Sequence, residues 1–577
     1  MSWNLKTRLK ETAGKEQGAF VFAPGARRHL MALVYPNEYH VGMSNLGMHI
    51  IYRQVNSRGD TACERFFLPD KKTQMEYLHT NTPLLSVENQ QPLYLFPLIA
   101  FAVSFEMDYF NIIKILSLGK VPALAAERQN GDPLVIIGGP CATFNPEPLA
   151  DFVDVCVIGE GEEVIGEILD SYDKSIELKL EREEILLNLS QISGLYVPKY
   201  YQPRYKSDGT IKTFDISPQV PQKIKKRYVE NLNDYSGTTV IKTSDTQFKD
   251  MYLIETARGC GRHCRFCMAG YCFLKPRMRR TETIAKAVKE AKDIYNCPKI
   301  GLVGAAVSDH GQIDEICRII QSDGLGISTA SLRADSLSLS LVDALAKSGH
   351  KTITLAPEAG SERLRRVINK NINSEHLEKA VSLAVSSGIN NVRLYIMIGL
   401  PTEAGEDIEA IIFMTKNIKF QMEQYGSKGV LTLSINPFVP KPFTPFQWLP
   451  MAEEKEIDKK TKKIRDALKN EKGIKLIFES TKETYIQAIL ARGDRRLSKV
   501  LMQTEKDALS FGKAMKQSGL DEKFYLYRSR EQTEILPWHN LSMGFRESYL
   551  YEEYLDSLKE KQTPPCSAHC RRCGICQ

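Results

Sequence analysis

Residues 255–272 read ETARGCGRHCRFCMAGYC and hold four of the chain's 13 cysteines. Cys260, Cys264 and Cys267 have C-x3-C-x2-C spacing, directly after an apolar, strand-like run. Three thiolates on one short loop can hold three irons of a [4Fe-4S] cube and leave the fourth iron open. A zinc ribbon would need a second cysteine pair about 15–20 residues further on, which is missing. The spacing predicts an iron-sulfur site, with zinc-binding or merely buried cysteines as the alternative, and Cys272 lies outside it.

The region around this loop, residues 248–450, alternates apolar runs with helix-length stretches. Six βα repeats over about 200 residues predict a partial TIM barrel, with chemistry at the carboxyl ends of its strands. The cysteine loop then follows the first strand. The expected strands are residues 252–257, 299–305, 326–332, 352–359, 392–399 and 430–438.

The preceding region, residues 1–170, also alternates strands and helices. Residues 30–35, 98–105 and 134–139 are continuous apolar runs bounded by turn residues. Continuous rather than alternating apolar strands predict a parallel sheet covered on both faces. We therefore expect an α/β protein whose N-terminal domain is Rossmann-like and doubly wound. Residues 171–247 are expected to be a connector, and residues 451–577 a small mixed C-terminal domain ending in cysteines.

Composition is ordinary for a globular protein, with 42% hydrophobic and 25% charged residues. The polar N-terminus lacks a secretory signal, and the longest apolar run, residues 92–105, is too short to span a bilayer. Thirteen cysteines without an export signal favour a reducing compartment and metal ligation over disulfides. We expect a cytoplasmic protein with no membrane association.

The net charge of +7 is mildly basic. Local basic runs occur at residues 225–228, 277–280 and 492–496. Because aromatic residues are sparse among them, we expect solvated faces, with RNA binding as the alternative.

The last residues of the chain form a second cysteine cluster. Its spacing is C-x3-C-x2-C-x2-C, and its members are Cys566, Cys570, Cys573 and Cys576. Four thiols this close could hold a second [4Fe-4S] cluster or one Zn²⁺, and a redox-active tail without metal is the third alternative. A cluster here would relay an electron or anchor a substrate.

The first cysteine loop resembles that of the radical SAM superfamily. The resemblance implies that the open iron binds S-adenosylmethionine (SAM), and that one-electron reduction releases a 5'-deoxyadenosyl radical, which abstracts hydrogen from a substrate. Phe266 matches the aromatic residue common in such loops, and Arg258, Arg262 and Arg265 suit an anionic cluster. The alternative class is an iron-sulfur electron carrier or RNA-binding scaffold without radical turnover.

The same resemblance suggests residues that bind SAM. The segment LVGAAVSDH (302–310) lacks the usual Gly-Gly-Glu, which leaves Ser308 and Asp309 as candidates. STASLRADS (328–336) offers Ser331 and Arg333 for the SAM carboxylate, and Glu358 is the candidate ribose contact. Ordinary salt bridges at strand ends are the alternative for the charged members of this set.

The segment GGPCATFNPEPLADFVDVCVIGEGEE (138–163) resembles the end of a cobalamin-binding domain. Gly138 and Gly139 match the glycines that let the backbone approach the nucleotide tail of the cofactor, and Ser104 matches a hydroxyl residue after the preceding strand. The signature of the lower axial ligand is not met, because one residue separates His40 from Gly42. Cobalamin is a candidate cofactor.

The chain as a whole resembles a family of radical SAM proteins that fuse this domain to the barrel and end in cysteines. The resemblance rests on YPNEYHVGMSNLG, NPEPLADF, GCGRHCRFCMAG, SLRADSL, RGDRRLSKV, ILPWHNLSMGF and CRRCGIC. We expect methylation if cobalamin binds, or a rearrangement or sulfur insertion without it. Expected partners are a reductant such as flavodoxin or ferredoxin and a separately encoded radical-SAM-linked chain, with RNA as one candidate substrate.

Overall fold

The computed structural model describes residues 2–567 and 569–576 and divides into two compact units. The first unit comprises Met1–Asp250, Ile489–Glu522 and Thr533–Gly544. The second comprises Met251–Ala488, Lys523–Gln532 and Phe545–Gln577. Residues 451–577, expected as one C-terminal domain, are thus shared between the two units.

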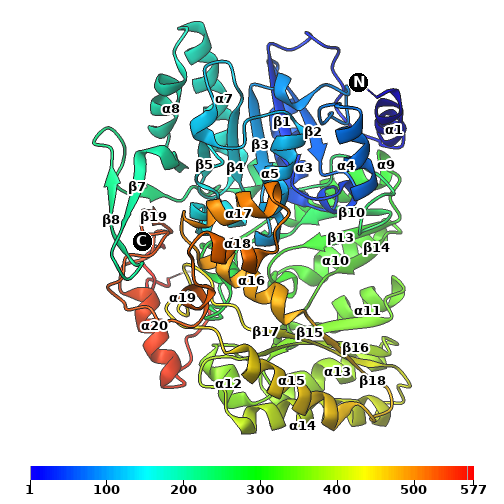
Figure 1. The fold of residues 1–577 in the computed structure, drawn as a ribbon. Coiled ribbons are helices and arrows are strands. Elements are labelled where there is room, and N and C mark those ends of the chain that lie inside the picture. Colours follow the sequence, from blue (N-terminus) through cyan, green and yellow to red (C-terminus); the bar gives the residue numbers. More distant parts are fainter. Residues whose placement is uncertain (1, 568, 577) are drawn as a thin grey trace. The chain divides into compact units, whose positions relative to one another are not determined.

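The first unit is built on a six-stranded sheet with the order β2-β1-β3-β4-β5-β6 (Figure 1). All neighbouring pairs are parallel except β5 and β6. This is the doubly wound order 2-1-3-4-5 with one added edge strand, which confirms the expected fold class. The strands are β1 (His29–Tyr35), β2 (Thr61–Phe67), β3 (Leu98–Ala102), β4 (Leu134–Gly138), β5 (Val155–Val157) and β6 (Leu195–Tyr196).

Both faces of this sheet are buried because successive side chains point to opposite sides. Met31 and Leu33 share a core with α3 (Leu46–Asn56), α7 (Gly161–Glu177) and α8 (Arg182–Ser190). Ala32 and Val34, on the opposite face, are also fully buried. The unit's other helices are α1 (Trp3–Ala13), α2 (Tyr39–Gly42), α4 (Lys71–His79), α5 (Tyr109–Leu118), α6 (Pro140–Phe144), α17 (Leu497–Lys506) and α18 (Phe511–Gln517).

The basic run at residues 492–496 is part of the first unit's interior. Arg495 is 8% exposed and forms an ion pair of 2.9 Å with the buried carboxylate of Glu147. The side-chain amide of Asn145 donates to the carbonyl oxygens of Ala491 and Gly493. The motifs NPEPLADF and RGDRRLSKV therefore fold against each other. This run is structural, neither a solvated face nor an exposed basic patch.

Short antiparallel and parallel strands complete the first unit. The hairpin of β7 (Tyr201–Tyr205) and β8 (Ile211–Ile216) is antiparallel. β9 (Ile224–Lys225) pairs in parallel with β19 (Leu541–Ser542), which brings the second returning segment of the chain back to this unit.

The second unit is a partial barrel whose parallel strands follow one another in chain order. β10, β13 and β14 form one sheet, and β15 to β18 form the other. A parallel bridge between Leu332 and Leu355 joins them. The predicted partial TIM barrel is confirmed, with a seventh strand, β18, beyond the expected six. The strands are β10 (Met251–Glu255), β13 (Lys299–Val303), β14 (Gly326–Thr329), β15 (Thr352–Glu358), β16 (Asn391–Ile398), β17 (Leu431–Pro437) and β18 (Ile474–Phe478).

Amphipathic helices cover the outside of these strands, as Figure 1 shows. Their apolar side chains and those of the strands form one continuous core. Among the described residues, no helix has the length and apolar character to cross a bilayer. These covering helices are α9 (Thr281–Asp293), α10 (Ile313–Ser322), α11 (Leu339–Lys347), α13 (Ser374–Ser386), α14 (Gly405–Gln424) and α15 (Glu454–Leu468). The unit also contains α12 (Glu362–Val367) and α20 (Tyr549–Leu558), while α16 (Thr481–Arg492) and α19 (Glu522–Leu526) contain residues of both units.

Candidate active site

The first cysteine loop begins where β10 ends, and its first turn requires glycine. Gly259 has a φ of +80°, and a Cβ built on it would stand 2.1 Å from the carbonyl oxygen of Phe273. Glycine alone adopts this conformation without strain. The short antiparallel pair of β11 (Ala257–Arg258) and β12 (Arg277–Met278) closes the base of the loop. Cys260 therefore lies at the carboxyl end of the barrel's first strand.

Replacing Gly259 by alanine should displace this loop. The added methyl group would meet backbone atoms, which cannot rotate away, and a positive φ costs a non-glycine residue about 1 kcal/mol or more. We expect iron bound by the purified protein to fall by about half if each cysteine cluster holds a [4Fe-4S] cube. Gly311→Ala is the matched control, since a Cβ there has nothing within 4 Å. Equal iron content in both variants would contradict the prediction.

The thiols of Cys260, Cys264 and Cys267 lie within electrostatic range of one another. Burial, followed by the neighbouring thiols of Cys264 and Cys260, raises the pKa of Cys267 to about 12. Burial and the Cys264 thiol also raise the pKa of Cys260. Such thiols stay protonated unless positive charge neutralises them, and a coordinated metal does so by deprotonating the thiol. The loop has the chemistry of a metal-binding site.

The described side chains show no preformed site for a single metal ion. Within residues 2–567 and 569–576, no three Cys, His, Asp or Glu side chains converge as such a site requires. A [4Fe-4S] cube distributes its ligands over separate irons, so its thiols stand further apart than the ligands of one ion.

Arg262, inside the cysteine loop, ties the loop to two other strand ends. Its guanidinium donates to both carboxylate oxygens of Asp309 at 2.7 Å and to Asp335 at 3.1 Å. Arg333 donates twice to Asp335, at 2.9 Å each. Asp309 follows β13 and Asp335 follows β14. Two predicted residues, Asp309 and Arg333, thus share one network with the loop.

The remaining predicted SAM-binding residues lie in different environments. The hydroxyl of Ser308 is 2.8 Å from that of Ser336, whereas Ser331 is exposed. Glu358 ends β15 with a φ of +67° and accepts from the ammonium of Lys370 at 3.3 Å. The structure thus brings Ser308 and Glu358 into hydrogen-bonded contacts and leaves Ser331 at the surface.

Lys370 is a buried cation beside the thiols that the sequence patterns did not single out. Burial alone would lower its pKa, but the carboxylate of Glu358 and then the thiol of Cys264 outweigh burial and raise the pKa. An ammonium held charged at 7% exposure suits a site built for an anionic cluster or ligand. No periodicity or spacing in the sequence marks this residue, because it lies in an irregular turn after α12.

The tail cysteines contact the first cysteine loop directly. The N–H of Cys566 donates to the carbonyl oxygen of Gly261 at 2.8 Å, and its Sγ lies 2.9 Å from Nε2 of His263. A Cβ on Gly261 would stand 2.9 Å from the Cβ of Cys566, so the two segments touch. His263 and Cys566 are 303 residues apart in the chain. The two cysteine clusters are therefore neighbours in the second unit.

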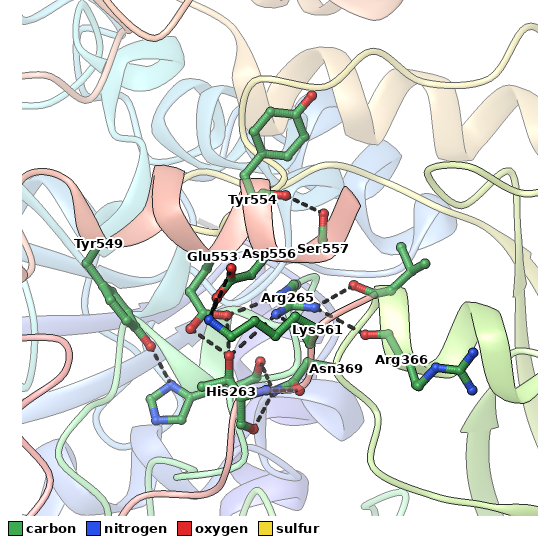
Figure 2. Close-up of polar contacts among 12 residues, drawn as sticks. His263, Arg265, Arg366, Asn369, Tyr549, Glu553, Tyr554, Asp556, Ser557 and Lys561 are labelled. Carbon is green, nitrogen blue, oxygen red and sulfur yellow. Dashed lines mark hydrogen bonds and ion pairs between the residues drawn. The ribbon is translucent and has the colours of Figure 1, made fainter. Parts of the chain in front are cut away.

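Arg265, two residues further along the loop, is fully buried and joins the loop to the tail (Figure 2). Its guanidinium donates to the carboxylate of Glu553 in α20 at 3.1 Å and to the carbonyl of Lys561 at 2.7 Å. It also donates to the carbonyl oxygens of Arg366 and Val367, which end α12. One side chain thus satisfies acceptors from three separate segments.

Asn369 provides a second clamp between the same segments. Its side-chain amide donates to the carbonyl oxygens of His263 at 3.0 Å and Thr563 at 3.1 Å. Its Oδ1 accepts from the N–H of Thr563 at 2.9 Å. The hydroxyl of Thr563 in turn donates to Glu553 at 2.8 Å. Asn369 has a φ of +52°, a conformation that asparagine tolerates better than most residues.

The four tail thiols also lie within range of one another. Burial, then the thiols of Cys570, Cys573 and Cys576, raises the pKa of Cys566 to about 12. For Cys570, burial would raise the pKa, but the N–H and guanidinium of Arg572 outweigh it and lower the pKa. Four thiols in one short segment suit a [4Fe-4S] cluster, whereas among the described residues they do not converge as the ligands of one zinc ion would.

In the first unit, the residues predicted to face cobalamin surround the carboxyl ends of β3 and β4. Gly139 has a φ of +100°, and a Cβ there would stand 2.7 Å from the carbonyl oxygen of Val103. A Cβ on Gly138 would meet only Val157, at the ordinary distance of 3.8 Å. Close strand packing therefore explains Gly139, while a side chain at Gly138 would make only an ordinary contact.

The loops after β1 and β3 bind each other at the switch point of this sheet. The side-chain amide of Asn45 donates to the hydroxyl of Ser104 at 3.1 Å, and that of Asn37 donates to Asp108 at 2.8 Å. His40 is partly exposed, with Nδ1 3.7 Å from the carboxylate of Glu38. The loop thus holds His40 beside the carboxylate of Glu38.

Two family models match the chain. Residues 254–415 match the radical SAM superfamily, and residues 47–198 match the N-terminal model of radical SAM proteins. An uncharacterized protein of Methanocaldococcus jannaschii is 32% identical over 496 residues, which are 86% of this chain and 95% of that protein. This chain belongs to the radical SAM superfamily. It is an enzyme of the class that uses a [4Fe-4S] cluster, which the cysteine spacing predicted, and SAM, which the resemblance to this superfamily implied.

Two further relatives of this radical SAM enzyme match over about half of its length. An uncharacterized methyltransferase of Pyrococcus horikoshii is 26% identical over 52% of this chain and 62% of its own length. A tRNA-2-methylthio-N(6)-dimethylallyladenosine synthase of Aquifex aeolicus is 24% identical over 51% of this chain and 62% of its own. The chain therefore spans less than two thirds of either relative.

Among solved structures, the radical SAM methyltransferase TsrM of Kitasatospora setae is similar, with a TM-score of 0.45 and 16% identity. The match covers 70% of this chain and 72% of TsrM. A TM-score below 0.5 is too low to establish a shared arrangement of the whole chain.

Proposed function

We propose that this radical SAM enzyme holds its catalytic cluster on Cys260, Cys264 and Cys267 and binds SAM at the adjoining strand ends. The proposal rests on one observation: three thiols lie close to one another on the loop that turns at Gly259, where β10 ends. Arg262 fastens that loop to the ends of β13 and β14. When bound, the cluster supplies the electron that cleaves SAM, and the resulting 5'-deoxyadenosyl radical abstracts hydrogen from the substrate.

The chain's own residues supply positive charge and position around the thiols. Arg333 and Lys370 are buried cations near Cys264, suited to an anionic cluster and to the carboxylate of SAM. Asp309 holds Arg262 and Glu358 holds Lys370, and both carboxylates offer acceptors for the amino and ribose groups of SAM. Ser308 adds a hydroxyl at the end of β13, and Ser331 is the weaker candidate because it is exposed.

For the reaction, we propose transfer of a methyl or methylthio group to a carbon of the substrate. The names of the Pyrococcus horikoshii and Aquifex aeolicus relatives support this class. Cobalamin in the first unit would favour methyl transfer, and the position of Gly138 at the carboxyl end of β4 supports its binding. The name of the Aquifex aeolicus relative supports an RNA substrate. The basic runs of the sequence support it less, because Arg277, Arg279 and Arg495 are buried.

Anaerobic reconstitution with iron and sulfide tests the proposal. With SAM and dithionite, the loaded enzyme should form 5'-deoxyadenosine, and its cluster spectrum should change when SAM is added. An iron-loaded protein that does neither would overturn the proposal and favour an electron carrier. Cobalamin retained after purification from cobalamin-fed cells would select methyl transfer. We further propose flavodoxin or ferredoxin as the electron donor and a separately encoded radical-SAM-linked chain as a partner.

A further inference from the structure

His263 is the residue through which the first cysteine loop reaches the tail. It lies between Cys260 and Cys264 and is 1% exposed. Both of its ring nitrogens have partners: Nε2 is 2.9 Å from the Sγ of Cys566, and Nδ1 is 3.1 Å from the hydroxyl of Tyr549. Figure 2 shows the contact with Tyr549, which comes from α20.

The two partners determine where the ring proton lies once Cys566 binds metal. A metal-bound cysteine is a thiolate, which can only accept a hydrogen bond. Nε2 of His263 must then carry the proton and donate to Cys566, while Nδ1 accepts from the hydroxyl of Tyr549. A second partner that selects the tautomer is typical of residues that surround metal ligands.

The ring is also held rigidly. The carbonyl oxygen of His263 accepts from Asn369 at 3.0 Å and from the hydroxyl of Tyr271 at 3.2 Å. Tyr271 and Tyr549 both pack edge-on against the imidazole. The backbone of His263 has a φ of +55°, which costs energy that these contacts offset. The contacts keep Nε2 directed at Cys566.

We propose that the tail thiols hold a second, redox-active [4Fe-4S] cluster and that His263 raises its reduction potential by donating to Cys566. A donor to a cluster sulfur stabilises the extra negative charge of the reduced state. A one-electron carrier would reduce the tail cluster, which would pass that electron to the first cluster and return to its oxidised state. The inference rests on the proposed function only in placing the catalytic cluster on the loop that contains His263.

The test measures the tail cluster alone. In a full-length protein with Cys260→Ser, Cys264→Ser and Cys267→Ser, only the tail thiols can bind a cluster, and we expect about four irons per chain. An anaerobic redox titration followed by electron paramagnetic resonance then gives its potential. His263→Phe should shift the potential downward, because the donor is lost. His263→Gln should shift it less, because its amide can still donate.

Tyr549→Phe keeps every ring in place and removes only the hydroxyl that selects the tautomer. We expect this variant also to lower the reduction potential of the tail cluster. If His263→Phe fails to assemble a cluster, the potential of the Tyr549→Phe variant tests the inference instead. One zinc ion per chain in place of iron, or unchanged potentials in these variants, would overturn the inference. Because the background protein lacks the first cluster, this outcome is independent of 5'-deoxyadenosine formation, on which the proposed function depends.

Discussion

Replacing Cys264 by alanine should abolish 5'-deoxyadenosine formation and remove about four irons per chain. Cys264 is the middle of the three cysteines and is buried. Its thiol adds to the rise in pKa that burial causes at Cys260 and Cys267. Two remaining thiolates leave two irons of the cube without a protein ligand, so the first cluster should not survive purification. Iron analysis and chromatography of the anaerobic reaction would measure both effects.

Cys272→Ala is the control for this variant. Cys272 is fully buried, lies five residues after Cys267 and falls outside the C-x3-C-x2-C spacing. Its loss should cost about 1 kcal/mol of stability through the small cavity and leave iron content and SAM cleavage intact. If the Cys264 variant retained the iron and turnover of the unmodified enzyme, these thiols would not be the ligands of the catalytic cluster.

The parts of the fold that were predictable share a clear local signal. The continuous apolar runs of β1, β3 and β4 showed in the sequence because their side chains are buried on both faces. The six barrel strands showed because apolar runs alternate with helix-length stretches, although strands such as β15 and β16 alternate buried and partly buried residues. The strand β2 lacked this signal because it contains Glu64 and Arg65. Arg65 is buried in ion pairs of 2.6 Å with Glu16 and Glu88, partners that no sequence pattern connects to it.

The seventh barrel strand was hidden for a related reason. β18 alternates partly buried and exposed residues and includes Lys475, so it resembled the charged region around it. In the structure it pairs in parallel with β17, and this pairing satisfies the backbone groups on that side of the strand. A half-exposed edge strand carries too few apolar residues to be distinguished from a polar segment.

For the site, spacing revealed the metal-binding thiols but not their surroundings. The two cysteine clusters are recognisable because each lies within one short segment. The contact between Cys566 and His263 joins positions 303 residues apart, and it depends on tertiary folding alone. Lys370 and Asn369 were missed because a single polar residue in a turn has many ordinary uses. Their roles became visible only from burial and from their partners.

Replacing Arg265 by methionine should loosen the first cysteine loop and the tail together. The variant would leave the carboxylate of Glu553 buried without its cation and deprive the carbonyl oxygens of Val367 and Lys561 of a donor. Removing one partner of a buried ion pair typically costs about 3–5 kcal/mol. We expect a lower thermal midpoint of the metal-free protein and poor loading of iron at both cysteine clusters.

Arg366→Met is the matched control. Arg366 lies in α12 and its guanidinium pairs with a carboxylate, that of Glu560, but its side chain is 41% exposed. A half-exposed pair contributes about 1 kcal/mol or less, so this variant should keep nearly the midpoint and iron content of the unmodified enzyme. Adding Glu553→Gln to Arg265→Met should recover part of the lost stability, because the unpaired buried charge is then removed. Equal midpoints for the Arg265 and Arg366 variants would contradict the role of Arg265 in joining the loop to the tail. Replacing a buried cation that joins three segments should cost more stability than replacing a half-exposed one.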